Sequence, residues 1–328
     1  MFLTFSANAQ WKEIADSLHE NESSQDCPDI VNWVFEMKRR ELKDDIKNNK
    51  MLGECISHVD IIEFQKRCLP HTHMMIWLNE EDLSRTPGDY DKFICAELPD
   101  PIDPDELFKL VTKLMIHGPC GKNNPKSPCM VNGKCSKGYP KPLQKHTVHG
   151  GESIYPIYRR RHPEDGGFTV EIKIKDQGHK PFVVDNSWII PYNPILLLKY
   201  QAHINLELVA TVLGIKYLFK YFHKGSDRVM VEVMGKLVED EIKTFINARY
   251  TSSNEAHWRM SEYKMSTMYP SVQALAMHLP GEQSCYMDDK EFKDLTGEAR
   301  RIAYQKVLDR TEKTTLTEFF QENKKVDS

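Results

Sequence analysis

The amino-acid sequence predicts an α+β fold, in which a sheet carries helices on its faces. Residues 57–78 read as a β-hairpin, because two runs with strand-like alternation flank a tight turn at 66–70. Strand-like and helix-like segments then follow one another along the chain without internal repeats. Hydrophobic residues at 40% and charged residues at 28% are typical of a folded globular protein and exclude a largely disordered chain.

The segments after the hairpin are assigned from their periodicity and their capping residues. Residues 105–116 predict a helix with one apolar face, and Asp103 or Asp105 stands near its start. Strand-like alternation returns at 168–174 and again at 202–208. The chain after the hairpin therefore continues to mix helices with strands.

A length of 328 residues exceeds one average domain of roughly 150 residues, so one large or two fused units are expected. Residues 211–224 predict a further helix that ends at Gly225. After that helix the pattern is one of short helices with polar faces. We therefore expect a first domain over 1–230, with a Cys/His-rich basic insert at 117–151, and a helical carboxy-terminal extension over 231–328.

The composition argues against a membrane-spanning, a secreted and a disulfide-stabilised protein. The longest apolar runs fall far short of the roughly 18 residues of a membrane helix, so no membrane partner is expected. The start, Met1–Phe5, lacks the basic region and the length of a secretory signal, so we expect an intracellular protein that is not secreted. Eight cysteines without such a signal argue against a disulfide scaffold.

Two histidines in the second strand of the hairpin form the first candidate site. Side chains alternate along a strand, so His71 and His73 share the face opposite the apolar residues. Imidazoles one strand repeat apart, about 7 Å along the backbone, can converge on one divalent cation. On the preceding strand Glu63, with Gln65 as the alternative, would complete the site. The competing interpretation is a pair of half-exposed strand histidines, which is the commoner case for a bare His-x-His.

Two tyrosines on the helix predicted over 211–224 form the second candidate site. Tyr217 and Tyr221 lie one turn apart and off the apolar stripe of that helix, with Lys220 adjacent. A phenol beside a cation and a metal-polarised phosphate can act as a nucleophile toward phosphorus. Taken by itself, the helix favours two surface tyrosines that pack on a neighbouring element. Combined with the histidine hairpin, the helix instead favours tyrosines that act as nucleophiles.

A third candidate site is a cluster of potential metal ligands within the insert. His117, Cys120, Cys129 and Cys135 supply four ligands, enough for a closed tetrahedral zinc site. Their spacing departs from the paired Cys-x₂-Cys pattern, but a loop without core periodicity needs such a cross-link to present its lysines. We therefore favour structural zinc, and free thiols are the alternative.

The net charge of −4 conceals a strongly basic segment. From Gly118 to Arg161 nine basic residues accompany a single acid, a local balance of +8, with aromatic residues among them. Such a segment could follow a phosphate backbone and stack on bases. On charge alone a solvated basic loop is an equal alternative. The residues expected to contact DNA are Lys134, Lys137, Lys141, Arg159, Arg160 and Arg161.

Several motifs, in this order along the chain, together resemble one known family. The three main runs contain His71-Thr-His73, His203-Ile-Asn-Leu-Glu207 and Lys216-Tyr-Leu-Phe-Lys-Tyr221. They resemble the replication-initiator-like region of Helitron transposon proteins, which belongs to the HUH endonucleases of the two-tyrosine type. Further similarity begins at Phe2–Phe5 and continues through 250–259 and 278–283, so the resemblance extends over nearly the whole chain.

The resemblance carries expectations for topology, metal and activity. It implies an antiparallel sheet and an HUH-type endonuclease as the first domain. It implies that His71 and His73, with Glu63, hold Mg²⁺ or Mn²⁺, and that Tyr217 and Tyr221 are the nucleophiles. The implied activity is sequence-directed nicking and joining of single-stranded DNA during rolling-circle transposition in the nucleus.

The chain also departs from the family pattern. Thr72 replaces a usually apolar residue of the metal motif, which its core-facing position should tolerate. Cys68 stands where a glycine is common. No Gly-x₄-Gly-Lys-Ser/Thr loop occurs, so the helicase of full transposon proteins is expected in a longer parent protein. A catalytically inactive, DNA-binding remnant is the alternative, against which the retained histidines, glutamate and tyrosines argue.

Overall fold

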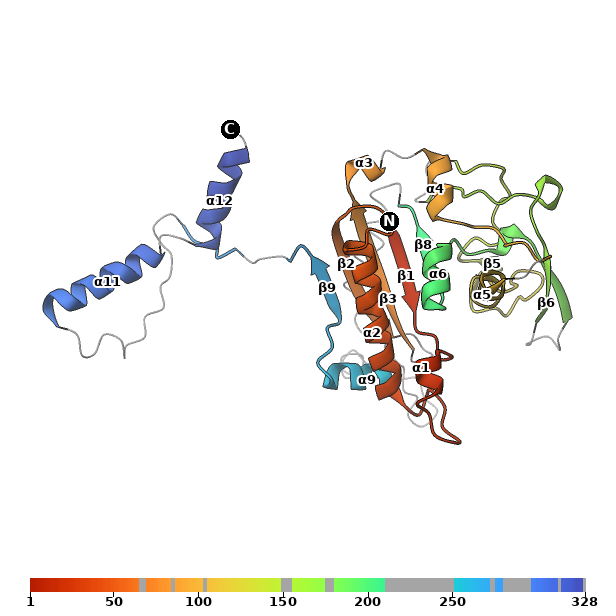
Figure 1. Ribbon diagram of the computed structural model, residues 1–328, viewed down its shortest axis with the longest axis horizontal. Helices are drawn as coiled ribbons and strands as arrows, with labels where there is room; N and C mark the ends of the chain where they lie inside the picture. Colours follow the sequence, from red (N-terminus) through yellow and green to blue (C-terminus); the bar gives the residue numbers. More distant parts are fainter. Residues whose placement is uncertain are drawn as a thin grey trace. The chain divides into compact units, whose positions relative to one another are not determined.

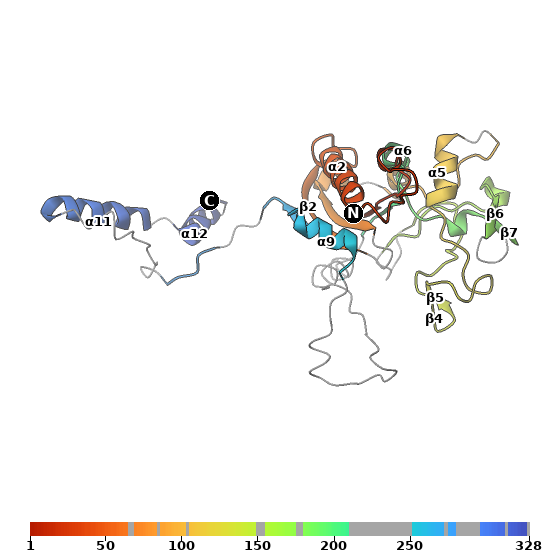
Figure 2. The same ribbon diagram turned by 90° about the horizontal axis from the view of Figure 1, so that it is seen from below.

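The computed structural model divides into two compact units, Met1–Pro270 and Ser271–Ser328, each described here by itself. Figures 1 and 2 show the chain from two directions at right angles. The first unit contains the sheet and both candidate metal sites. The described residues are 1–64, 69–83, 86–102, 105–148, 155–174, 180–209, 251–271, 275–279, 296–311 and 314–326.

The first unit is built on a five-stranded antiparallel sheet, which confirms the predicted α+β fold. The strands β2 and β3 form the predicted hairpin, and β3 is paired on both of its sides. The strand predicted over 202–208 lies at one edge of the sheet. In spatial order the strands are β8 (Ile204–Glu207), β1 (Phe2–Ser6), β3 (Pro70–Leu78), β2 (Cys55–Phe64) and β9 (Ser266–Tyr269).

One face of this sheet is covered by the long helix α2 (Pro28–Lys47), which runs along it in Figure 1. Proline suits the first turn of a helix because its fixed φ is helical and its missing N–H needs no partner there. The apolar stripe of α2 meets alternate residues of β1 and β3, and the rings of Phe5 and Phe35 stack with centroids 5.4 Å apart. This packing forms the main hydrophobic core.

A buried ion pair also fixes α2 to the sheet. The Arg39 guanidinium donates to Glu36 of the same helix, with 2.7 Å between Nε and Oε2, and to Asp60 of β2. All three side chains are almost inaccessible to water. An unpaired charge would be costly in this environment, so the two carboxylates keep the guanidinium in place and set which turn of α2 faces β2.

Residues 251–270 belong to the first unit, which differs from the expected boundary at 230/231. Helix α9 (Ser253–Met260) packs on α2 through Trp258, whose side chain is fully buried. Asn32 Nδ2 donates to the carbonyl oxygen of Asn254 at 2.7 Å. The following strand, β9, pairs with β2. The boundary therefore moves to Pro270, and the segment after 231 is not purely helical.

A second hydrophobic core in the same unit positions the insert. It gathers α5 (Glu106–Leu114), the separate hairpin of β6 (Val170–Ile174) and β7 (Lys180–Val184), and one face of α6 (Pro194–Tyr200). Helix α6 also reaches the main core, so it links the two. The helix predicted over 105–116 and the strand predicted over 168–174 are thereby confirmed.

The start of α5 shows which of two predicted aspartates caps it. Asp105 Oδ1 accepts a hydrogen bond from the backbone N–H of Phe108 at 2.8 Å, whereas Asp103 lies outside the described residues. The remaining short elements of this unit are α1 (Lys12–Ala15), α3 (Glu80–Leu83), α4 (Pro87–Phe93), β4 (Met130–Val131), β5 (Lys134–Cys135), and the 3₁₀ turns η1 (Pro163–Asp165) and η3 (Asn186–Trp188).

The second unit contains α11 (Gly297–Thr311) and α12 (Thr315–Val326), as expected for a helical extension. The helix predicted over 211–224 lies outside the described residues. Among the helices that are described, none combines the length and the apolar content needed to cross a membrane.

Replacing Thr72 by valine should raise the free energy of unfolding by about 1 kcal/mol. Thr72 is fully buried on the α2 side of β3, as predicted, and its hydroxyl has no hydrogen-bond partner. Valine keeps the β-branched shape and removes the unsatisfied group. Urea denaturation of both proteins measures the difference. The control is Thr147→Val, which removes a buried hydroxyl that is bonded to Asp91; equal losses of stability in the two variants would contradict the prediction.

Candidate functional site

The histidine pair lies on the sheet face opposite α2, as strand alternation predicts. His71 and His73 point away from the main core. Thr72, which lies between them in sequence, and Met74, which follows them, are buried on the core side. Glu63 lies directly opposite His71 in the register of the hairpin. Its Oε2 is 3.0 Å from Nε2 of His73. The structure therefore places the two histidines and the carboxylate on one face of the sheet, with Glu63 in contact with His73 and opposite His71 in the register.

Three side chains of β1 complete this site, and sequence reasoning missed all of them. Ser6 Oγ lies 2.6 Å from Nδ1 of His71, and Thr4 Oγ1 lies 3.1 Å from Nδ1 of His73. The ring of Phe2 stacks on the His73 ring with centroids 5.7 Å apart and planes within 8°. The available signal was the alternation of β1, which puts residues 2, 4 and 6 on one face.

The electrostatic setting of His71 suits metal binding. Burial, together with the neighbouring His73 and His203, lowers the pKa of His71 to about 4, although Glu63 opposes the shift. The His71 imidazole is therefore neutral near pH 7, and the neutral ring is the form that binds a metal. Two imidazoles and a carboxylate form a mixed donor set that Mn²⁺ accepts readily, whereas Mg²⁺ favours oxygen ligands and retains water.

Four of the proposed site residues cannot be placed. Tyr217, Tyr221 and Lys220 lie outside the described residues, and so does Gln65, the alternative to Glu63. The described residues therefore include the expected metal ligands His71, His73 and Glu63 but neither of the expected nucleophiles.

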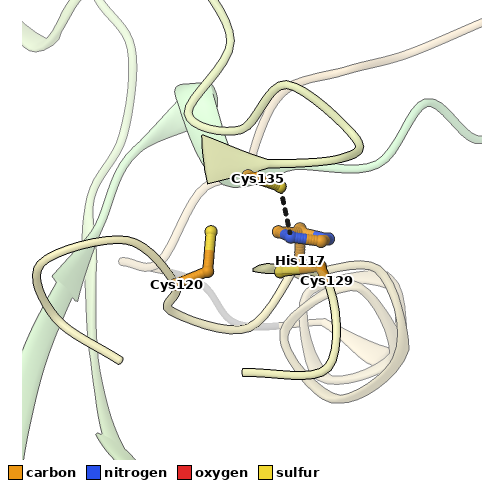
Figure 3. Close-up of side chains that lie close together, drawn as sticks. All are labelled: His117, Cys120, Cys129 and Cys135. Atoms are coloured by element: carbon orange, nitrogen blue, oxygen red, sulfur yellow. Dashed lines mark hydrogen bonds between the residues drawn. The ribbon is translucent and has the colours of Figure 1, made fainter. Parts of the chain in front are cut away.

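The insert brings His117, Cys120, Cys129 and Cys135 to one point, as Figure 3 shows. One ligand atom from each lies within 4.8 Å of the others, and Cys135 Sγ is 3.5 Å from His117 Nε2. Among the described residues, this cluster is the group of three or more potential metal ligands whose ligand atoms all lie this close to one another. A tetrahedral zinc site, with bonds of about 2.3 Å to sulfur and about 2.05 Å to nitrogen, would put S and N about 3.6 Å apart.

The protonation of this cluster follows from its packing. Burial lowers the pKa of His117, helped by the charges of Lys141 and Lys137, so the ring is neutral. Burial and the neighbouring thiols raise the pKa of Cys120, which therefore holds its proton in the metal-free chain. Zinc binding must displace such protons, so this donor set should bind zinc more tightly as the pH rises.

The cluster is tied to the basic residues of the insert. The His117 ring stacks on Tyr139 with centroids 4.1 Å apart and planes within 12°. The Lys141 ammonium lies 5.0 Å from the centre of the Tyr139 ring. Lys134 and Lys137 are exposed on and beside β5. A metal that fixes the four ligands would thus also fix the loop that carries these lysines.

Arg160, expected to contact DNA, is instead a buried structural residue. Its side chain is 2% exposed. Nη1 donates to the backbone carbonyls of Ala96, Asn186 and Ile189, at 3.2, 2.7 and 2.6 Å. These three carbonyl acceptors and the burial of the side chain hold the guanidinium inside the unit, so Arg160 is not available to a phosphate. The expectation for this residue is corrected accordingly.

The two neighbouring arginines remain partly exposed but are held by acids. Arg161 makes a two-pronged contact with Glu97, with 2.9 Å from Nε to Oε1 and 2.8 Å from Nη2 to Oε2. Arg159 lies 3.3 Å from the same carboxylate and 3.8 Å from Asp91. These pairs reduce the positive charge that the sequence count assigned to the segment.

A further titratable group lies on the histidine face at the sheet edge. The register of β8 puts Glu207 opposite Phe2, on the same face as His73. Burial raises the pKa of the Glu207 carboxyl to about 7, although a hydrogen bond from Tyr158 and the charge of Arg160 oppose the shift. This carboxyl therefore keeps its proton through mildly acidic conditions.

Comparison with known proteins identifies the amino-terminal part of the chain. Residues 1–76 match the family model described as the Helitron helicase-like domain at the N-terminus. The matched segment includes β1, β2 and most of β3, and so all the residues of the histidine site described above. This confirms the resemblance to Helitron proteins over that segment. A search of curated proteins gave no match.

The purified protein should contain about one equivalent of zinc, because the four ligands form one closed site. Cys129→Ser should lose the zinc and keep the circular dichroism of the sheet, while Cys27→Ser, which changes a thiol outside the cluster, should keep both. Metal analysis measures the first result. Less than about half an equivalent in the parent would make these cysteines free thiols.

The Glu207→Gln variant should differ from the parent in the pH dependence of stability. The pKa of about 7 in the folded state exceeds the ordinary value of 4.5, so the folded state binds more protons between these values. The stabilisation that the protonated Glu207 carboxyl gives the folded parent is complete below pH 4.5. It is lost as the pH rises through about 7. The stability of the variant relative to the parent should therefore increase by roughly 1–3 kcal/mol from about pH 5 to about pH 8.

Urea denaturation at both pH values measures this change, with the exposed Glu171→Gln as the control for losing a carboxylate. Parallel pH profiles for the parent and Glu207→Gln would show that burial does not perturb Glu207.

Proposed function

We propose that this chain nicks single-stranded DNA and transfers the cut strand through a covalent phosphotyrosine, as in Helitron transposition. The observation that carries the proposal is the grouping of His71, His73 and Glu63 on one face of the sheet, within the segment that matches the Helitron domain. Imidazole nitrogens and a carboxylate are ligands that a divalent cation accepts, and such a cation can polarise a phosphate.

The metal's contribution is electrostatic. A Mn²⁺ or Mg²⁺ ion held by His71, His73 and Glu63 would polarise the scissile phosphate and make phosphorus a better electrophile. The chain's own residues hold and orient the ligands. Thr4, Ser6 and Phe2 contact the two imidazoles and keep their rings in place.

The nucleophile in this proposal is Tyr217 or Tyr221, assigned from the family resemblance. The phenol oxygen forms a bond to phosphorus as the bond from phosphorus to the 3′ oxygen breaks. The phenol loses its proton, the 3′ oxygen gains one and leaves as a hydroxyl, and the 5′-phosphate remains on the tyrosine. The second tyrosine serves the second transfer, and Lys220 would favour the phenolate. The order in which the tyrosines act is left open.

The insert supports the DNA-binding part of the proposal. Lys134 and Lys137 are exposed, and Lys141 lies against an aromatic ring beside the Cys/His cluster. Such a surface can hold a phosphate backbone. A helicase domain in a longer parent protein would supply the unwound strand, and nuclear DNA would be the substrate.

A covalent adduct between the protein and a single-stranded oligonucleotide tests the proposal. With Mn²⁺ the parent should form an adduct that survives denaturing electrophoresis. The Tyr217→Phe/Tyr221→Phe double variant should lose it by at least about 100-fold while DNA affinity stays within about threefold, because the phenol oxygens react but do not hold the strand. His71→Ala/His73→Ala should lose it equally, and EDTA should abolish it until Mn²⁺ is restored.

Matched controls are Tyr269→Phe at the sheet edge and His19→Ala outside the sheet, both of which should retain the adduct. An unchanged yield in the double tyrosine variant would remove the mechanism. DNA binding by the parent without any adduct would instead identify a catalytically inactive remnant.

A further inference from the structure

We infer that the hydroxyls of Thr4 and Ser6 are positioning groups that hold His73 and His71 by their Nδ1 atoms and allow each ring to present Nε2 to the cation. This inference rests on the proposed function for the metal itself. It adds to the site two residues whose side chains need not touch the metal or the DNA, and it specifies how the imidazoles change their proton arrangement when the metal binds.

The contacts are set by the strand register. In the β1–β3 ladder Thr4 is the direct partner of His73, and Ser6 is the direct partner of His71. Directly opposite side chains on one face of an antiparallel pair have Cβ atoms about 4.5–5.5 Å apart. A short hydroxyl and an imidazole on such a pair meet without rearrangement. The two hydrogen bonds therefore follow from the same alternation that exposes the histidines.

The His73 ring has a polar group against each of its nitrogens. Its Nε2 lies 3.0 Å from Glu63 Oε2, and its Nδ1 lies 3.1 Å from the Thr4 hydroxyl. In the tautomer with the proton on Nε2, that N–H donates to the carboxylate and Nδ1 accepts from the Thr4 hydroxyl.

Metal binding through Nε2 requires the opposite arrangement. The proton on Nε2 must leave, and a neutral ring then carries its proton on Nδ1. That Nδ1–H needs an acceptor, and the same Thr4 oxygen supplies one after its O–H rotates. The proton given up at Nε2 goes to solvent and Nδ1 takes one from solvent, so this exchange leaves the charge of the ring unchanged. Glu63, whose Oε2 faces Nε2, is the proposed third ligand.

A hydroxyl is suited to this exchange because it both donates and accepts. A backbone carbonyl in its place would only accept, and would hold the ring in one tautomer throughout. Metal-bound histidines usually donate their second N–H to an oxygen partner, and removing that partner typically reduces metal affinity by about 10–100-fold. The hydroxyls of Thr4 and Ser6 occupy the position of that oxygen partner, because they contact the Nδ1 atoms of His73 and His71.

His71 shows the same arrangement in a simpler form. Among the described residues Ser6 is the hydrogen-bond partner of its ring, at 2.6 Å from Nδ1, and Ser6 itself is buried. A hydrogen bond in such a poorly solvated position orients the ring more strongly than one in water. The Nε2 atom on the far side of the ring is thereby directed away from β1.

The same sheet offers a control threonine. Thr72 lies between the two histidines in sequence but on the opposite face, where its hydroxyl has no partner. Thr72→Val and Thr4→Val make the same chemical change one strand apart. A purely structural effect of removing a threonine hydroxyl from this sheet would appear in both variants.

The test combines metal titration with nitrogen NMR of the imidazoles. Thr4→Val and Ser6→Ala should each weaken Mn²⁺ binding by about 10–100-fold in calorimetry, while Thr72→Val should leave it unchanged. In the metal-free protein, the ¹⁵N shifts of His73 should change with Thr4→Val and those of His71 with Ser6→Ala. Thr4→Ser, which keeps the hydroxyl, should restore affinity to within about threefold of the parent.

The outcomes separate this inference from the proposed function. If the parent binds Mn²⁺ and Thr4→Val and Ser6→Ala bind it equally well, the positioning role is overturned and the metal site stands. If the parent binds no Mn²⁺, the metal site itself fails. If Thr4→Val does not fold, Thr4→Ser decides: a serine variant that folds but binds Mn²⁺ about 10-fold more weakly would show that the hydroxyl is not the determinant.

Discussion

The antiparallel register of β3 between β1 and β2 decides where every described group of the candidate active site lies. With this register, His71 and His73 share a face with Glu63 on one side and with Ser6 and Thr4 on the other. A slip of one residue would turn the imidazoles into the core beneath α2. The buried residues of β3 resist such a slip, because their own burial would be lost. Core packing and the candidate metal site are thus two results of one alternation.

The hairpin, the carboxylate beside it and the Cys/His cluster could be predicted from the sequence because each depends on spacing within a short stretch. The contacts of Thr4 and Ser6 could not. They depend on β1 pairing with a strand almost seventy residues away, and local periodicity does not reveal the partner of a strand. Arg160 was assigned wrongly for the same reason, since its three carbonyl acceptors come from two distant segments.

The two candidate metal sites are built on different principles. The Cys/His cluster closes around a point within an insert that has little regular structure and packs against the second hydrophobic core. The histidine site is a row of side chains on the sheet, supported from β1 by the hydroxyls of Thr4 and Ser6.

The return of the chain to the sheet through α9 and β9 has a kinetic consequence for the tyrosines. Strand β8 precedes residues 210–250 in the chain, and helix α9 follows them. Both elements belong to the first unit. The segment that contains Tyr217 and Tyr221 is therefore tethered at both ends to the body that carries the histidines. In the proposed mechanism, these two attachments would restrict how far either phenol can diffuse from a bound phosphate. They would also keep a covalently held DNA end near the site of the proposed second transfer.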